Sequence, residues 1–305
     1  MQCYKCNHPL NPSEPAHYGL HPACFKIWFQ SETLPVFTGL QRKATASSSD
    51  GLIIDPDNSS FFHGKFKKYT AILNGESYIL KMREPEAPEL PEVEYLCNKI
   101  AAILGISTAQ FYYLEFTGDR VFVTKNFIAG RHGLDLQHIY HFRTNEPHDC
   151  ETLMYVIKEY TKQPRDILMF IHMVLFDALI GNHDRHGRNL AFIASSSGYQ
   201  LSPTYDNVSY LGLEHGKMLH ADFNPTGKIA TRCSLEPSMT HYVAEFMRLG
   251  YGQICQDFYK KITFSDNAIK TAILTNPCTA LMKAAMQRLI FKRNRELYDA
   301  LSTHA

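Results

Sequence analysis

Two patterns of hydrophobic and polar positions divide the chain. From residue 66 onward, short apolar runs are broken by turn residues: FKKYTAIL and ESYILKM flank Asn74-Gly75, and further candidate strands span 111–116 and 121–125. Asn-Gly accepts the positive φ angles of a tight type I′ turn, so the first two runs are predicted to form an antiparallel hairpin. Apolar residues recur at helical spacing over 92–104, after Pro91. This pattern predicts an antiparallel sheet with one helix.

Beyond residue 150, strand patterns become rare. Helical periodicity over 153–160, 165–180, 239–249 and 279–301 predicts a mostly helical second part. The segment 165–180 is apolar nearly all round, which indicates a central, buried helix. The fold class is therefore α+β, with a small antiparallel-β lobe followed by a larger, mostly helical lobe.

The composition excludes several kinds of protein. The 305 residues include 31 Lys and Arg against 30 Asp and Glu, so no strong overall field attracts nucleic acid or an anionic membrane. The most apolar stretch, 167–180, is too short to cross a bilayer. The polar start, MQCYKCNHPLNP, does not resemble a signal peptide, and five of the eight cysteines are scattered. We expect a cytoplasmic protein that binds neither DNA nor a membrane directly.

One polar run carries the candidate chemistry. GNHDRHGRNL follows the apolar segment that ends at residue 180, and SPTYD comes at the end of the second of two short apolar strands. Asp184 and Asn189 are five positions apart, and Asp206 lies 22 positions after Asp184. Phosphoryl transfer needs one carboxylate to orient the attacking hydroxyl and accept its proton, and an amide and a second carboxylate to hold Mg²⁺. We predict that Asp184 is the base and that Asn189 and Asp206 bind Mg²⁺.

Asp and Asn are also common loop residues, so this spacing alone is weak evidence for catalysis. The context favours the catalytic interpretation: a buried helix leads into the loop, His183 and His186 flank Asp184, and two apolar strands follow. We assign His186 to the cofactor-binding residues as well.

A cation for the phosphates and a carboxylate that holds it are predicted in the first lobe. Lys81 lies in the strand ESYILKM, and the next helix carries Glu94, with Glu92 as a competing partner. Taken in isolation, a strand Lys and a helix Glu are usually solvated surface residues. We predict that Lys81 and Glu94 are a pair because the catalytic pattern lies downstream.

The loop that covers the phosphates is expected just before the first hairpin. Gly64 there would let the backbone approach the phosphates, and Lys65 and Lys68 would supply positive charge. Since the segment has a single glycine, a basic surface strand is an equally good interpretation of each lysine.

The combination of GNHDRHGRNL and SPTYD resembles the HipA-like toxin kinases, which are serine/threonine kinases distantly similar to phosphatidylinositol kinases. The similarity extends from about residue 52 to 300 and includes Lys81 and Glu94. It implies a two-lobed kinase-like fold, ATP and Mg²⁺ as cofactors, and a protein Ser or Thr as the acceptor. The family's phosphate loop typically reads S-x-x-G-x-Q-x-K. Gly64 and Lys68 match it, whereas Phe66 replaces the Gln and Phe61 the serine, which argues against autophosphorylation in this loop.

Full-length members of that family carry an additional N-terminal subdomain of about a hundred residues, for which this chain has little room. In this respect the chain resembles the short HipT branch. The resemblance implies an aminoacyl-tRNA synthetase as substrate. It also implies two antitoxin partners: a helix-turn-helix repressor and a small HipS-like protein that supplies the missing subdomain.

Two other functions remain open. A phosphoinositide lipid kinase has a similar G-x-x-D-R-H-x-x-N loop, but it should also show a basic or amphipathic face that docks on a membrane. A pseudokinase that serves as a binding module is favoured by the weak phosphate loop. It is disfavoured by the presence together of Lys81, Asp184, Asn189 and Asp206.

The first 24 residues contain two closely spaced pairs of metal-ligand residues. Cys3 and Cys6 form one pair, His21 and Cys24 form the other, and 14 residues separate them. Tetrahedral Zn²⁺ takes such a set, with one pair on a turn and the second pair entering a helix predicted over 22–29. The metal can then fold a segment too small to have its own core. Four unrelated residues are the alternative. We predict a structural zinc site that braces the β-rich lobe or docks a partner, and some HipA-like kinases have a similar head.

These features predict three parts of the chain. A head like a zinc knuckle spans 1–30, a β-rich N-lobe with Lys81 and Glu94 spans 31–128, and a helical C-lobe with the catalytic and metal-binding loops spans 129–305.

Overall fold

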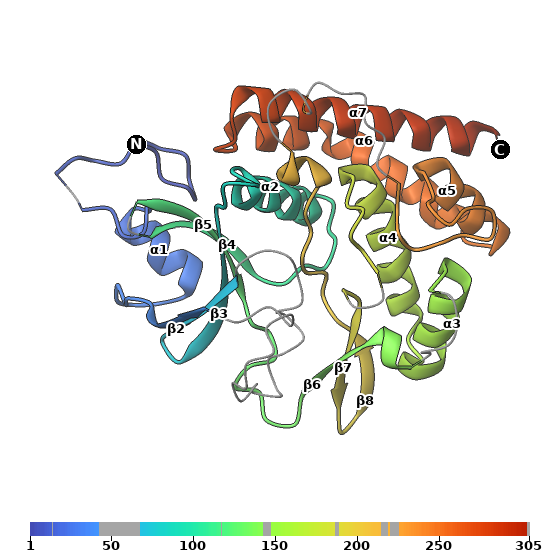
Figure 1. Ribbon diagram of the computed structural model, residues 1–305, viewed down its shortest axis with the longest axis horizontal. Coiled ribbons are helices and arrows are strands. Elements are labelled where there is room, and N and C mark those ends of the chain that lie inside the picture. Colours follow the sequence, from blue (N-terminus) through green and yellow to red (C-terminus); the bar gives the residue numbers. More distant parts are fainter. Residues whose placement is uncertain are drawn as a thin grey trace.

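The computed structural model describes residues 1–13, 15–42, 68–116, 118–142, 148–186, 189–214, 219 and 226–303. They form a small β-rich lobe and a larger helical lobe side by side (Figure 1). The small lobe contains α1 (Pro22–Phe29), β1 (Thr38–Arg42), β2 (Lys68–Leu73), β3 (Glu76–Met82), α2 (Leu90–Ile103), β4 (Phe111–Phe116) and β5 (Asp119–Lys125). The large lobe contains β6 (Asp135–His138), η2 (Ile139–His141), α3 (Cys150–Thr161), α4 (Pro164–Ile180), β7 (Ala191–Ser195), β8 (Gly198–Leu201), η3 (Tyr210–Leu213), α5 (Met239–Arg248), α6 (Gly252–Thr275) and α7 (Ala280–Thr303). The predicted α+β class is confirmed.

The small lobe is built on a five-stranded antiparallel sheet in the order β1-β2-β3-β5-β4. The predicted hairpin is present: β2 pairs with β3, and Leu73 lies opposite Glu76 across the turn. Asn74 and Gly75 adopt φ angles of 50° and 77°, as a type I′ turn requires. On its other side β3 pairs with β5, so β3 lies in the middle of the sheet.

Different parts of the chain pack on the two faces of this sheet. Helix α2 packs on β4 and β5 and places Tyr95 on one face, against Tyr113 and Phe122. The other face packs against residues of the first 30 positions, including Leu20 and Phe25, which are fully buried. The head therefore shares the hydrophobic core of the β-rich lobe.

Helix α4 forms the centre of the large lobe, in contact with α3, α5, α6 and α7. Phe170 and Phe176 of α4 are fully buried, and burial of a phenylalanine contributes roughly 1.5–3 kcal/mol. Gly181 ends the helix in a left-handed conformation with φ = 68°, which a residue with a Cβ rarely adopts. The predicted central helix is thus present, and its end fixes where the following loop begins.

Helix α6 is absent from the sequence prediction. Its buried residues Cys255, Phe258 and Ile262 recur at helical spacing, but the polar runs KK and SDN interrupt the pattern. The helix packs against both α2 and α4. Just beyond it, Asn276 donates a hydrogen bond to the carbonyl of Glu92 at 3.3 Å. Helix α6 therefore ties the small lobe to the large one. In the described part of the chain, no helix is long and apolar enough to cross a membrane.

Candidate active site

Lys81 of β3 lies at the junction of the two lobes. Its Nζ is 2.5 Å from Glu94 Oε1 on α2 and 2.6 Å from Asp206 Oδ1 in the large lobe. The side chains of Lys81 and Glu94 are 9% and 1% exposed, respectively. One buried ammonium group is thus shared by carboxylates from both lobes.

The competing glutamate of α2 has other partners. Glu92 Oε1 accepts hydrogen bonds from Arg83 and from the Tyr113 hydroxyl, the latter at 2.6 Å. Residues two positions apart on a helix point to nearly opposite sides, so Glu92 and Glu94 cannot both face Lys81. The structure therefore pairs Lys81 with Glu94.

Asp206 follows β8 and forms a second ion pair with a lysine. Lys68 Nζ, at the start of β2, lies 3.1 Å from its Oδ2 atom. Asp206 has φ = 53°, in the left-handed region that costs energy for a residue with a Cβ. Such strained conformations concentrate at functional sites, where the surrounding structure holds them in place.

Burial and charge act in opposite directions on these groups. Burial alone would raise the pKa of Asp206, but the Lys68 and Lys81 ammonium groups hold that pKa well below its ordinary value. Burial lowers the pKa of Lys68 despite the attraction of Asp206. For Lys81, Asp206 and Glu94 outweigh burial and raise the pKa above its ordinary value. Asp206 is therefore an anion, and Lys81 stays charged at neutral pH.

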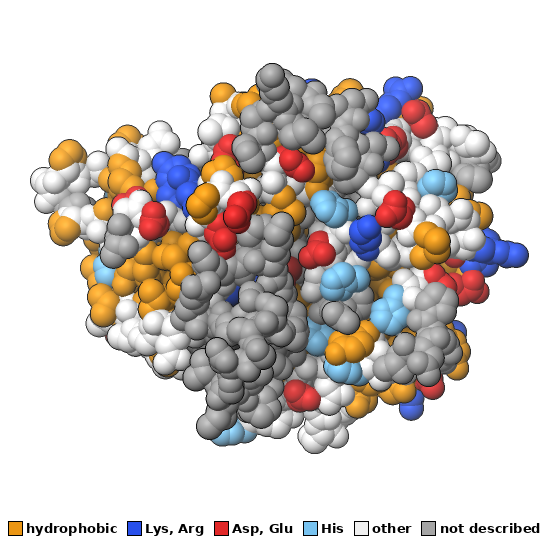
Figure 2. Space-filling model, viewed as in Figure 1, with side chains coloured by type: hydrophobic (Ala, Val, Ile, Leu, Met, Phe, Trp, Pro, Cys, Tyr) orange, Lys and Arg blue, Asp and Glu red, His pale blue; other side chains and the backbone are white. Residues whose placement is uncertain are grey.

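Asp184 lies in the loop after α4, in a different environment. Its side chain is 73% exposed, and His186 Nε2 lies 3.9 Å from its Oδ1 atom. Asn189 Nδ2 donates a hydrogen bond to the main-chain carbonyl of Asp184 at 3.0 Å. Within the described residues this bond leaves the amide oxygen of Asn189 available as a ligand. In the space-filling view, histidine side chains gather on the large-lobe side, while acidic side chains occur over both lobes (Figure 2). The Asp184 carboxylate is thus largely exposed to solvent.

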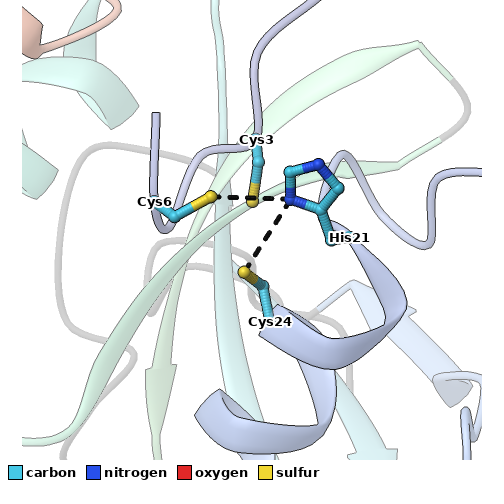
Figure 3. A group of neighbouring side chains, drawn as sticks. All are labelled: Cys3, Cys6, His21 and Cys24. Atoms are coloured by element: carbon cyan, nitrogen blue, oxygen red, sulfur yellow. Dashed lines mark hydrogen bonds between the residues drawn. The ribbon is translucent and has the colours of Figure 1, made fainter. Parts of the chain in front are cut away.

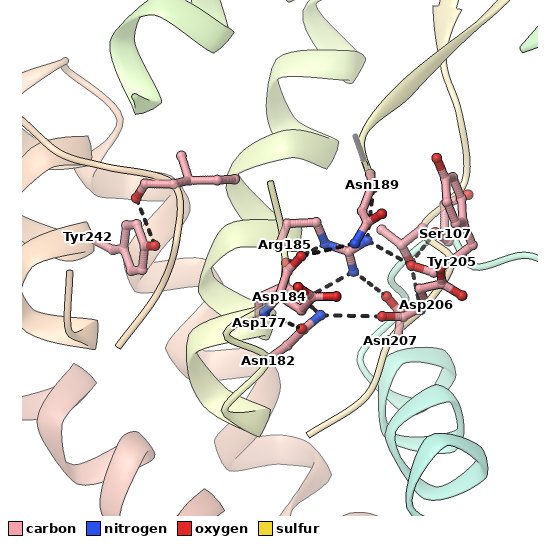
Figure 4. A network of polar contacts seen from close by, with 12 residues as sticks. Ser107, Asp177, Asn182, Asp184, Arg185, Asn189, Tyr205, Asp206, Asn207 and Tyr242 are labelled. Carbon is pink, nitrogen blue, oxygen red and sulfur yellow. Dashed lines mark hydrogen bonds and ion pairs between the residues drawn. The ribbon is translucent and has the colours of Figure 1, made fainter. Parts of the chain in front are cut away.

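Arg185, which the sequence prediction did not include, holds these loops together (Figure 4). Its side chain is 2% exposed, and its Nε donates to Asp177 of α4 at 2.8 Å. It also donates to the carbonyl oxygens of Asn189 and Tyr205 at 3.1 and 2.7 Å, and to Asn207 Oδ1 at 2.6 Å. One guanidinium therefore connects the end of α4 with the residues on either side of Asp206.

The Asp206 loop is also tied to the small lobe. Asn207 Nδ2 donates to Asn98 Oδ1 of α2 at 3.0 Å. Thr204 exchanges main-chain hydrogen bonds with the segment before β4, accepting from Ala109 and donating to Ser107. Asp206 is consequently held relative to α2, which carries Glu94.

A small apolar cluster joins the two sheets beside Lys81. Ile79 of β3 packs with Leu136 of β6, Ile193 of β7 and Tyr205. Ile79 is two positions before Lys81 and so points to the same face of β3. These residues form a hydrophobic surface next to the charged centre, and the sequence prediction did not include it.

The four predicted zinc ligands come together in the head (Figure 3). The ligand atoms of Cys3, Cys6, His21 and Cys24 all lie within 4.8 Å of one another. His21 Nδ1 is 3.5 Å from Cys6 Sγ and 3.9 Å from Cys24 Sγ. Its other ring nitrogen lies 3.0 Å from the carbonyl of Pro9, the kind of bond that orients a metal-binding imidazole. This donor set fits tetrahedral Zn²⁺.

The segment that carries Cys3, Cys6, His21 and Cys24, here called the knuckle, is connected to the helix that carries Glu94. Tyr4, between the first two cysteines, accepts a hydrogen bond at its main-chain carbonyl from the Tyr95 hydroxyl at 3.2 Å. The Tyr4 hydroxyl donates to Glu115 of β4 at 3.0 Å, and its ring packs edge-on against Tyr113. The head is thus in direct contact with the β-rich lobe, and its role as a brace stays a prediction.

Comparison with known proteins identifies the family of the chain. The sequence model of the HipA-like C-terminal domain matches residues 36–261. The chain belongs to this family. The resemblance to HipA-like kinases is therefore confirmed. No curated protein sequence matches the chain.

Two solved structures show the same fold. The Helicobacter pylori proinflammatory kinase CtkA aligns with a TM-score of 0.65 at 18% identity, over 78% of this chain and 93% of that kinase. HipA of Shewanella oneidensis MR-1, from a toxin–antitoxin system and solved in complex with HipB and operator DNA, aligns with a TM-score of 0.56 at 18% identity. That alignment covers 87% of this chain and 72% of that HipA chain. The two-lobed fold predicted for this HipA-like chain is confirmed.

The structure brings together part of the predicted set. Lys68, Lys81, Glu94 and Asp206 form one connected charged group, while Asp184, Asn189 and His186 lie in the adjoining loop. Gly64 and Lys65 of the predicted phosphate loop lie outside the described residues. The signal that could have revealed Arg185 is its place beside Asp184, together with Asp177, an acidic residue in the apolar second half of α4.

Proposed function

We propose that this HipA-like chain is an ATP-dependent serine/threonine protein kinase. The observation that carries the proposal is the Lys81 ammonium group, shared by Glu94 at 2.5 Å and Asp206 at 2.6 Å. A strand lysine paired with a helix glutamate, beside a metal-binding aspartate, is the arrangement that protein kinases need to hold ATP phosphates.

The residues at this centre fit ATP and Mg²⁺. Asp206 and the Asn189 amide oxygen would hold Mg²⁺, which prefers oxygen ligands. In the structure the Asp206 carboxylate forms ion pairs with two ammonium groups, and a divalent cation would bring the same positive charge to it. Bound Mg²⁺ would neutralise charge on the phosphates. Lys81 and Lys68 would bind phosphate oxygens, and the apolar surface around Ile79 and Ile193 suits the adenine ring.

Asp184 is the group that would act on the acceptor. Its exposed carboxylate would accept a hydrogen bond from the Ser or Thr hydroxyl and orient the oxygen toward the γ-phosphorus. As the new O–P bond forms and the bond to the β,γ-bridging oxygen breaks, the hydroxyl proton passes to Asp184. The main-chain bond from Asn189 and the contacts of Arg185 keep this loop in place.

The acceptor we propose is an aminoacyl-tRNA synthetase, whose phosphorylation would halt translation. The chain would be the toxin of a toxin–antitoxin system, as the Shewanella HipA is described to be. A helix-turn-helix repressor and a small HipS-like protein would be its antitoxins. A roughly 100-residue reading frame beside this gene, with a helix-turn-helix protein, would support this role. The zinc knuckle would be structural and hold the lobe that carries Lys81.

The test is phosphoryl transfer from γ-labelled ATP with Mg²⁺ to a panel of aminoacyl-tRNA synthetases. We expect Asp184→Asn to lower the rate by roughly 10²–10⁴-fold, since it removes the proton acceptor. Asp266→Asn, an exposed change on α6, should keep the full rate. Phosphoinositide vesicles are the second acceptor. Transfer to lipid alone would make the chain a lipid kinase, and no transfer by the native chain to any acceptor would contradict a kinase and favour a binding module.

A further inference from the structure

Strand β4 is at one edge of the five-stranded sheet, and its outward-facing backbone groups can be identified. Lys125 donates its main-chain N–H to the carbonyl of Gln110 on the inner side of the strand. Glu115 donates its N–H in the other direction, to Tyr18 of the head. Because the direction alternates along a strand, the odd-numbered residues of β4 direct their N–H and C=O groups outward.

The two ends of this outward edge are already paired. Thr204 bonds to Ser107 and Ala109 at one end, and Tyr18 bonds to Glu115 at the other. Between them lie Tyr113, which is fully buried, and Phe111, which is only partly buried. The main-chain N–H and C=O of Phe111 make no hydrogen bond to any residue that the structure describes. A short unpaired edge therefore remains, and exposed edges of this kind accept an added strand.

A hollow of about 460 Å³ opens at this unpaired edge. Its walls are Trp28 of α1, Tyr95 and Lys99 of α2, and residues 108–112. Trp28 packs with the apolar clusters on both faces of the sheet, and its ring meets Tyr112 edge-on. The hollow thus has aromatic rings on both sides of an unpaired backbone edge.

Among the described residues that line the hollow, one is charged, and its charge is positive. Lys99 Nζ lies 5.4 Å from the centre of the Tyr95 ring. No carboxylate within the described ranges is close enough to form an ion pair with it. A carboxylate from a ligand would supply the missing counter-charge in a half-buried site, where such a pair is stronger than on an open surface.

We propose that this hollow binds an extended peptide segment of a partner protein, one that carries an aromatic side chain and a nearby carboxylate. The peptide backbone pairs with the Phe111 edge, the aromatic side chain contacts Trp28 and Tyr95, and the carboxylate meets Lys99. The unpaired backbone groups favour a peptide over a small aromatic acid, which could use only the rings and the charge. The hollow contains none of the proposed catalytic residues, and the proposal does not rest on the proposed kinase activity.

Trp28 is the only tryptophan of the chain, so its fluorescence reports directly on the hollow. The probe is a tryptophan-free pool of acetylated nonapeptides with Phe or Tyr at the centre, random flanks and one Glu. A matched pool carries Lys in place of Glu, and a third pool is N-methylated at the central residue. We expect the Glu pool to change Trp28 emission saturably below about 1 mM, with at least tenfold weaker responses to the other two pools.

Charge reversal tests the role of Lys99. Lys99→Glu should reverse the preference in favour of the Lys pool, whereas Lys270→Glu, on the exposed surface of α6, should leave it unchanged. Circular dichroism confirms that both variants are folded. No emission change with the Glu pool, or equal responses to all pools, would overturn the proposal. So would a response to N-acetylphenylalanine as strong as the response to peptide, or a dimer by sedimentation that Lys99→Glu dissociates.

Discussion

The two halves of the candidate centre are held in place by different physical means. In the large lobe, the loops around Asp184 and Asp206 are connected by Arg185, a buried guanidinium with five hydrogen bonds to defined partners. In the small lobe, the helix with Glu94 is held through aromatic contacts and through Tyr95, which reaches the knuckle at Tyr4. The first support is permanent once the chain has folded. The second includes four predicted metal ligands, so we expect it to weaken when the metal is removed.

The strongest test of this difference is Arg185→Met. It leaves Asp177 charged and buried without its partner, and breaking such a pair costs about 3–5 kcal/mol of unfolding free energy. The rate of phosphoryl transfer should fall as well, by a factor that corresponds to at least the same free energy. The loops of Asn189 and Asp206 lose the side chain that connects them. Denaturant unfolding and labelled-ATP transfer measure the two effects. Arg165→Met, at an exposed position on α4, is the matched control. Native-like stability of Arg185→Met would show that the network is dispensable.

The knuckle is tested by Cys6→Ser, with Cys233→Ser as control because Cys233 is exposed and outside the cluster. We expect Cys6→Ser to lose metal by elemental analysis and to lower the unfolding free energy by roughly 2 kcal/mol or more. A chelator should have the same effect on the native chain and none on the variant. If neither protein contains zinc and the chelator changes nothing, the small lobe has no metal support.

The stability of the large lobe is expected to decrease in acid. His172 of α4 lies against Phe258, near Lys261 and Asp257, and burial lowers its pKa to about 4. The unfolded chain binds this proton near pH 6.5, so stability is full above pH 6.5 and falls as pH decreases toward 4. The slope is at most about 1.4 kcal/mol per pH unit. Unfolding of His172→Phe measured between pH 7 and 4 should show a shallower decline, and equal slopes would contradict the assignment.

The smallest expected effect is that of Tyr95→Phe. This change removes only the hydroxyl that donates to Tyr4, so the expected loss is about 1 kcal/mol of unfolding free energy. Tyr155→Phe, at a residue that is 54% exposed, should be neutral. If Tyr95→Phe also lowers phosphoryl transfer beyond its effect on stability, the bond helps to position α2. An effect no larger than that of Tyr155→Phe would show that the knuckle and α2 are not coupled through it.

Local patterns in the sequence were sufficient for much of the fold. The Asn74-Gly75 hairpin, helix α4 and helix α1 follow from turn chemistry, apolar periodicity and a helix predicted at the second pair of ligands. The spacing of the four knuckle residues also predicted that they meet. Helix α6 was missed because its buried positions are interrupted by polar runs, and its helical state is stabilised by packing against α2 and α4.

Three features depend on the tertiary structure. The choice between Glu92 and Glu94 follows from the rotation of α2 against the sheet, which the sequence of the helix does not specify. The approach of Lys68 to Asp206 joins residues 138 positions apart. The main-chain groups of Phe111 stay unpaired because Thr204 pairs only with residues before β4 and Tyr18 of the head pairs only with Glu115.

By itself, the sequence determined which residue types could carry phosphoryl transfer and bind zinc, because those signals are short and local. It also determined the family, through the loop that contains Asp184 and the strand end at Asp206. Only the tertiary structure decided which charges meet, which guanidinium holds the loops and which strand edge stays open. Those outcomes depend on contacts between distant segments. Because an unpaired polar group is costly when buried, only specific pairs form, and residue spacing does not show which ones.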